Sequence, residues 1–184
     1  MTTGLTELTA TGKIYLEFLN EVMLSIQDEY PRIEQLCHLI TSAHSVHIFG
    51  FGRSGCAALA FAIRLRHFCN YLPPVLWVGD QVRQPIREGD VVILFSGSGD
   101  RPEINLVAQK AKKASASVVL ITAAQNSVLG AQSDLTLVLP EMKDSMVYGG
   151  GDFELGAFFL QEILVTHIGK RFGIPREEVE RNHV

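Results

Sequence analysis

Apolar residues follow a helical period at the start of the chain, and short apolar runs alternate with helical segments afterwards. Between residues 13 and 29 they recur every three to four positions, which predicts one helix. Pro31 suits the first turn of a second helix that reaches about residue 42. Short runs rich in β-branched residues then alternate with helix-like segments. These runs predict five strands, at residues 45–49, 75–78, 91–95, 117–122 and 135–139.

Helix-like segments separate most of these strands and follow the last one. They lie at residues 56–68, 102–113, 127–132 and 152–171, with a short final helix after Pro175. The strands read as continuous apolar runs, which is typical of strands covered on both faces. The pattern therefore predicts an α/β fold of three αβα layers around a five-stranded parallel sheet.

Length and composition fit one folded domain. With 184 residues, 47% of them hydrophobic and 20% charged, the chain can build one sizeable core. We expect a single domain over 1–184, with N-terminal helices (1–44), a βα core (45–140) and C-terminal helices (152–184). The apolar runs are of strand length, and residues 1–12 lack the features of a secretory signal. We therefore expect no membrane span and a cytoplasmic protein.

Charge and cysteine content limit the partners. Sixteen Lys and Arg against 20 Asp and Glu give a net charge of -4, so the molecule as a whole attracts neither nucleic acid nor an anionic membrane. Cys37, Cys56 and Cys69 form no CxxC pair, and we expect reduced thiols packed as small hydrophobes. His38 and His44 have no partner at metal spacing, so they indicate no metal site. An anionic ligand must be small and held locally.

Two glycine turns are the strongest candidates for that ligand. Gly50–Gly55 follows the first expected strand and Ser96–Arg101 follows the third, and each precedes a helix. In open α/β sheets ligands bind beyond the carboxyl ends of the strands. Glycines let backbone N–H groups approach an anion, the helix N-terminus adds partial positive charge, and serine hydroxyls bond phosphate or sugar oxygens. The expected substrate-binding residues are Gly52, Arg53, Ser54, Ser96, Gly97, Ser98, Asp100 and Arg101.

Other interpretations of these turns stay open. The first turn is a literal GxGxxG, and Asp80 fits the ribose-binding acid of a dinucleotide site. That interpretation leaves the second turn unexplained, and the chain is too short for an added substrate domain. The serines also suit simple capping of the following helices. Neither turn matches GxSxG or a Walker loop.

The C-terminal third contributes two further features. The triple glycine at 149–151 is either a linker or a place where backbone approaches a ligand. The helix at 152–171 carries a wide apolar face that includes Phe153, Phe158 and Ile163. Such a surplus of apolar surface predicts a homo-oligomer. The alternative is that all of these side chains pack inside the core of a single subunit.

Several segments together resemble the sugar isomerase (SIS) domain family, and within it the 6-phospho-3-hexuloisomerase branch. They are Gly50 to Gly55, residues 62–67, 78–80, 85–90 and 96–99, the Phe153–Glu154 pair and residues 176–183. The resemblance implies a flavodoxin-like five-stranded parallel sheet and a homotetramer. It also implies interconversion of D-arabino-3-hexulose 6-phosphate and fructose 6-phosphate through an enediol, with no metal or organic cofactor.

The resemblance assigns roles to individual residues. Ser54, Ser96 and Ser98 would hold the phosphate or the sugar hydroxyls with Arg53 beside them. Glu154 would be the acid/base residue. His183 would be a second proton-transfer group, acting in its own subunit or in a neighbour's. As alternatives, Glu154 suits the N-terminus of a helix, and His183 lies in a terminal segment.

The chain departs from the family pattern at three places. Asp100-Arg101-Pro102 stands where relatives carry a threonine, Tyr148 to Gly151 replaces a Pro-Met-Gly sequence, and the chain ends at Val184. These departures leave two alternatives open: a phosphosugar-binding regulatory module without catalysis, and an isomerase of another phosphosugar.

Overall fold

The computed structural model describes residues 2–142 and 151–183. Helices and strands alternate through most of this range, as the apolar pattern predicts. In chain order the elements are α1 (Thr2–Asp28), α2 (Tyr30–Ser42), β1 (Val46–Gly50), α3 (Gly52–Arg66), β2 (Val75–Trp77), β3 (Val91–Phe95), α4 (Pro102–Lys113), β4 (Ser117–Thr122), α5 (Val128–Gln132), β5 (Leu135–Val138), α6 (Asp152–Arg171) and α7 (Arg176–Arg181).

The five strands form one parallel sheet in the order β2-β1-β3-β4-β5. The register pairs Gly50, the last residue of β1, with Phe95, the last residue of β3. Because these strands are neighbours and end level with each other, the two glycine turns leave the sheet side by side. This placement is the one that open α/β sheets use for ligands.

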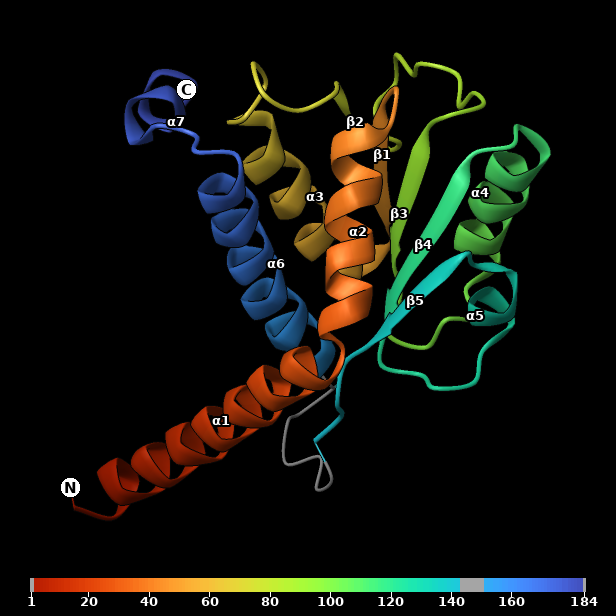
Figure 1. Cartoon of the computed structure of the whole chain (residues 1–184). Coiled ribbons are helices and arrows are strands. Elements are labelled where there is room, and N and C mark those ends of the chain that lie inside the picture. The colour runs from red at the N-terminus through yellow and green to blue at the C-terminus, as the bar shows by residue number, and fades with distance from the viewer. Residues whose placement is uncertain (1, 143–150, 184) are drawn as a thin grey trace.

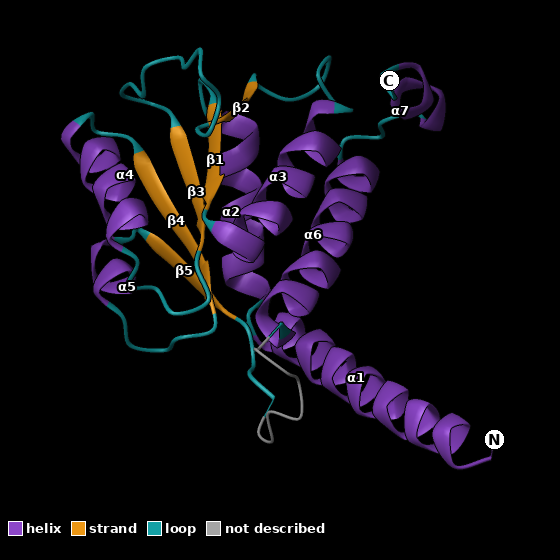
Figure 2. Ribbon diagram, turned by 180° about the vertical axis from the view of Figure 1, so that it is seen from behind, coloured by secondary structure: helices purple, strands orange, loops and turns teal. Residues whose placement is uncertain are grey.

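Helices cover both faces of the sheet. Figures 1 and 2 show α2, α3 and α6 on one side and α4 with α5 on the other. Strand β3 is buried throughout, with Ile93 and Phe95 in the core under α3 and α6 and Val92 and Leu94 in the core under α4. The prediction of an α/β fold with a doubly covered parallel sheet is confirmed.

One stretch of the sheet lacks a helical cover. Between β2 and β3 the chain makes turns and irregular structure over residues 78–90. Helix α4 contacts β3 and β4, so on that side β1 and β2 are left to this loop. A cavity lies there, between β1, β2, this loop and α4.

Helix α1 is longer than the apolar pattern predicts. It begins at Thr2, eleven residues before the expected start, and it runs away from the rest of the protein in both views (Figures 1 and 2). Its second half packs Phe18 and Val22 against α6. Its first half leaves Leu5 and Leu8 68% and 73% exposed. The first turns of α1 bury no apolar face in this chain. An apolar stripe in the sequence predicts only helices that bury one face, so these turns were not predicted.

The cysteines only partly match expectation. Cys37, Cys56 and Cys69 are all free thiols, but only Cys37 is buried, so the expectation of packed hydrophobes is wrong for Cys56 and Cys69, which lie on exposed positions of α3 and of the loop after it. Burial raises the pKa of the Cys37 thiol to about 11. Over the described ranges, no helix has the length and apolar character needed to cross a bilayer.

Candidate active site

Ser54 and Glu154 meet at the carboxyl edge of the sheet. Ser54 lies in the first turn of α3 and Glu154 in the first turn of α6, and these helices pack against each other. The Ser54 hydroxyl donates a hydrogen bond of 2.8 Å to Glu154 Oε1. The Glu154 side chain is 17% exposed, so the carboxylate is largely shielded yet reachable. Tertiary packing thus joins the first glycine turn to the predicted acid/base residue.

Positive charge surrounds this pair. Arg53 Nε lies 4.0 Å from Glu154 Oε2, and the N-termini of α3 and α6 add the partial positive charge of two helix dipoles. Gly151, the N-cap of α6, has φ 141, and a Cβ there would lie 2.6 Å from the Arg53 guanidinium. Gly151 therefore lets the backbone run close to Arg53. Tyr148, Gly149 and Gly150 lie outside the described residues.

Phe153 connects the second glycine turn to the same place. A Cβ built on Gly97 would lie 3.3 Å from the Phe153 ring, so the ring lies against the backbone of Gly97. Phe153 is buried in the core. The Phe153–Glu154 pair thus contacts both glycine turns, Gly97 through the ring and Ser54 through the carboxylate.

The serines of the second turn differ in exposure. Ser96 is 2% exposed, and its Oγ accepts a hydrogen bond from the N–H of Gly99 (3.1 Å). Ser98 is exposed, and its Oγ accepts a 3.5 Å bond from the N–H of Asp100. Ser96 therefore shapes the turn from inside, whereas Ser98 presents its hydroxyl to solvent.

Asp100 and Arg101 are held by other partners. Asp100 Oδ1 accepts a hydrogen bond from the N–H of Val128 at the start of α5 (3.0 Å). The Arg101 guanidinium lies over the Phe51 ring, 5.6 Å from its centroid. Since Phe51 belongs to the first turn, this cation–π contact bridges the two turns. Arg101 and Arg53 are thus both at the mouth of the site, and Asp100 fastens the second turn to α5.

His183 lies away from the other predicted residues. Its ring packs on His67, with 4.9 Å between centroids, just beyond the C-terminal end of α3. Ser54 lies at the opposite end of α3, a helix of 15 residues and therefore about 20 Å long. Within one chain the structure does not bring His183 to Glu154.

This arrangement is suited to holding a small anion beside a carboxylate. Gly52 has φ 61, a backbone conformation that favours glycine. A Cβ on Gly50 would lie 2.8 Å from the backbone oxygen of Ser54, so only glycine fits there as well. Backbone N–H groups at two helix N-termini, a serine hydroxyl and Arg53 attract an anion. Glu154 is then placed to accept or return a proton.

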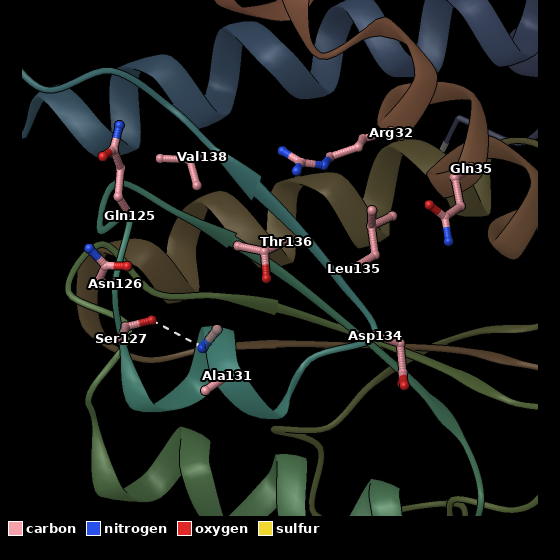
Figure 3. A pocket seen from close by; sticks show the side chains of 11 residues that line it. Arg32, Gln35, Gln125, Asn126, Ser127, Ala131, Asp134, Leu135, Thr136 and Val138 are labelled. Carbon is pink, nitrogen blue, oxygen red and sulfur yellow. Dashed lines mark hydrogen bonds between the residues drawn. The ribbon is translucent and has the colours of Figure 1, made fainter.

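A separate polar cavity of about 650 Å³ runs along the free edge of β5 (Figure 3). Arg32 and Gln35 of α2 line one side, and Gln125 and Asn126 line the other. Arg32 is paired with Glu29. None of the predicted site residues lines this cavity.

Two contacts escape sequence reasoning, one within this site and one outside it. The Arg101–Phe51 contact carries no motif, since a cation–π pair has no fixed spacing. The buried pair of His47 and Asp90 was also missed, because His47 reads as an ordinary strand residue and its partner is 43 residues away. The residues next to His47 in the sequence are apolar, and nothing in them indicates that His47 pairs with Asp90.

Known proteins match the chain along most of its length. The model of the SIS domain matches residues 39–152. Proteins named 3-hexulose-6-phosphate isomerase are similar: one from Methanocaldococcus jannaschii is 31% identical, covering 85% of both chains, and one from Bacillus subtilis is 30% identical, covering 94% of this chain and 97% of the relative. A crystal structure of a Methanococcus jannaschii protein, described as inferring the function of 3-hexulose-6-phosphate isomerase, superposes with a TM-score of 0.82 at 28% identity, over 92% of this chain and 97% of the other.

The strand order β2-β1-β3-β4-β5, with helices on both faces, defines an α/β protein of the flavodoxin-like type, with two glycine turns at the carboxyl edge of its sheet. The chain belongs to the SIS domain family. The resemblance drawn from the sequence motifs is confirmed.

Proposed function

We propose that this protein is a phosphosugar isomerase that interconverts D-arabino-3-hexulose 6-phosphate and fructose 6-phosphate, as the names of its relatives suggest. The observation that carries the proposal is the 2.8 Å hydrogen bond between Ser54 and Glu154, which puts a shielded carboxylate at the point where both glycine turns meet. The site residues, all of them proposals, are Gly52, Arg53, Ser54, Ser96, Gly97, Ser98, Asp100 and Arg101 for the substrate, with Glu154 and His183 for proton transfer.

The chemistry follows from the placement of the groups. The substrate phosphate binds at the helix N-terminus of a glycine turn, assisted by Ser98 and Arg53. This binding energy, gained far from the reacting carbons, positions them beside Glu154. Glu154 removes a proton from the carbon next to the carbonyl, an enediol forms, and the carboxyl group returns a proton to the other carbon. The isomerisation moves a carbonyl between C3 and C2 and requires no oxidant or metal.

His183 fits this scheme only as a group from a neighbouring subunit. It is separated from Glu154 of its own chain by the length of α3. The exposed leucines of α1 and the exposed Phe158 of α6 are apolar surface available for a second copy. We therefore propose a homo-oligomer, with a tetramer as the family resemblance suggests, built from one SIS domain per chain. Sedimentation showing only monomer at micromolar concentration would contradict it.

The test is proton exchange in D₂O. Fructose 6-phosphate is incubated with the protein and followed by proton NMR, because an enediol gives up its carbon-bound proton to solvent. Exchange at C3 is expected. Glu154→Gln keeps the shape of the side chain and should lower the rate by at least about 100-fold, the range that general acid–base groups contribute. Glu162→Gln is the control, because Glu162 lies on the same helix and bonds Arg64 at the surface.

Other results of the exchange experiment would support different conclusions. Full exchange in the Glu154→Gln variant contradicts the mechanism. Exchange at C1 indicates a 1,2-isomerase, which passes through a 1,2-enediol of fructose 6-phosphate. No exchange and no binding point to an isomerase of another phosphosugar. Tight phosphosugar binding without exchange supports the second candidate, a non-catalytic regulatory module. That candidate is favoured by one observation, the contact of Arg101 with Phe51, which holds a cation between the two glycine turns.

A further inference from the structure

A second cavity lies on the face of the sheet away from Glu154. It occupies the stretch where β1 and β2 have no helical cover and the loop of residues 78–90 closes over them. Its volume is about 360 Å³, within the range of small-molecule sites. Its walls come from β1, β2, this loop and α4, and none of the residues assigned to the glycine-turn site lines it.

One lining residue of this cavity, His47, belongs to a buried histidine–aspartate pair. His47 Nε2 lies 3.1 Å from Asp90 Oδ2, and the two side chains are 3% and 5% exposed. Asp90 Oδ2 also accepts a 2.8 Å bond from the N–H of Arg87, so the carboxylate is fixed. A fixed carboxylate orients an imidazole. With Nε2 engaged, Nδ1 is the polar ring atom of His47 that remains for a ligand in the cavity.

Another lining residue is Trp77, which also packs against the core under α3 and α6. Trp77 packs on Phe49 with 5.8 Å between ring centroids. A Cβ on Gly79 would lie 2.1 Å from Trp77 Nε1, so the indole keeps this position only because residue 79 is glycine. Trp77 is half-buried and lines the cavity. A flat ring held in place offers a stacking surface at little entropic cost.

The charges at the cavity favour an anion. Arg83 of the loop and Lys110 of α4 line it, and none of the described lining residues is acidic. Arg83 Nε donates a 2.9 Å bond to the backbone oxygen of Asp80, which holds this side chain at the cavity. The carboxylate of Asp90 is engaged by His47 and by the N–H of Arg87. A ligand that fits must carry negative charge as well as a flat or apolar part.

We infer that this cavity is a second ligand site, which binds a flat heterocyclic ring joined to a phosphate, the chemistry of a nucleoside monophosphate. The ring stacks on Trp77, the phosphate lies between Arg83 and Lys110, and His47 Nδ1 accepts a hydrogen bond from a ligand hydroxyl or N–H group. The inference does not depend on the proposed isomerase activity, because the two sites share no residue.

The chain supplies its own probe, since Trp77 is its only tryptophan. The full-length protein is titrated with adenosine monophosphate, and indole fluorescence and calorimetry are recorded with and without saturating fructose 6-phosphate. A saturable change is expected, unaffected by fructose 6-phosphate. Adenosine and inorganic phosphate alone should each bind at least about tenfold more weakly, because each lacks one of the two recognised parts.

Variants locate the site. Lys110→Ala should weaken binding about tenfold, the effect of losing one charge-assisted hydrogen bond. Lys113→Ala is the matched control, since Lys113 lies on the same helix and outside the cavity lining. His47→Gln should also weaken binding. Circular dichroism checks that the variants fold.

Three results would overturn the inference: no saturable signal at millimolar adenosine monophosphate, equal weakening by the two lysine variants, or displacement by fructose 6-phosphate. The last would put the nucleotide in the glycine-turn site. Failure here leaves the isomerase proposal untouched, because proton exchange is measured without nucleotide.

Discussion

The substitution Gly50→Ala tests how the first glycine turn is built. A Cβ on Gly50 would lie 2.8 Å from the backbone oxygen of Ser54 and 3.0 Å from the Cα and N of Gly55. All three atoms are backbone, so no side chain can swing away. Real Cβ atoms essentially never come this close, and the first turn of α3 must move to admit the methyl group.

The expected magnitude follows from that contact. Overpacking of a tight site typically lowers the free energy of unfolding by about 1–3 kcal/mol. Replacing glycine by alanine returns about 0.5 kcal/mol through the unfolded chain. The net loss should be about 0.5–2.5 kcal/mol, which for a chain of this size lowers Tm by roughly 1–10 °C. Since Ser54 itself moves, its bond to Glu154 should lengthen and the exchange rate should fall.

Urea unfolding of both proteins, with Tm as a second readout, measures the loss. The matched control is Gly169→Ala in α6, where the added Cβ would meet only the Phe68 ring at an ordinary 3.4 Å. A helical glycine replaced without a clash should be neutral or gain up to about 1 kcal/mol. If Gly50→Ala were as stable as Gly169→Ala, with an unchanged m value, the reasoning about the turn would be wrong.

Three further predictions concern other parts of the fold. A thiol reagent such as DTNB should label two cysteines, Cys56 and Cys69, in the native protein and a third only after unfolding, because burial raises the pKa of Cys37 to about 11; three rapid reactions would contradict this. Burial, then the nearby charges of His183 and Arg64, lower the pKa of His67 below its ordinary value, so the folded state resists its protonation. This contribution to stability is present above about pH 6.5 and is lost as the pH falls from there through the lowered pKa of the folded state. His67→Gln should therefore flatten the pH dependence of Tm below about pH 6.5, while the exposed His38→Gln should not. Phe153→Ala should lower the unfolding free energy by about 3–5 kcal/mol, against under about 1 kcal/mol for the exposed Phe172→Ala, and equal losses would show that Phe153 is not the packing link between the turns.

The sequence by itself determined the elements of this protein and the two turns. Strands β3 and β4 and helices α4 and α6 have the bounds that the apolar pattern and the prolines predict. Glycine turns directly after buried strands predict the ligand edge. These features are local, because a strand, a helix cap or a glycine turn is specified within a few neighbouring residues.

Only the tertiary structure decided which side chains meet. The Ser54–Glu154 bond joins residues 100 apart, and the His47–Asp90 pair joins residues 43 apart. The apolar pattern also could not predict the first turns of α1, because they bury no apolar face in this chain. Nor could it predict the position of His183, which depends on where α7 packs. Such pairs follow from sheet register and helix packing over long separations, and a linear pattern carries no record of them.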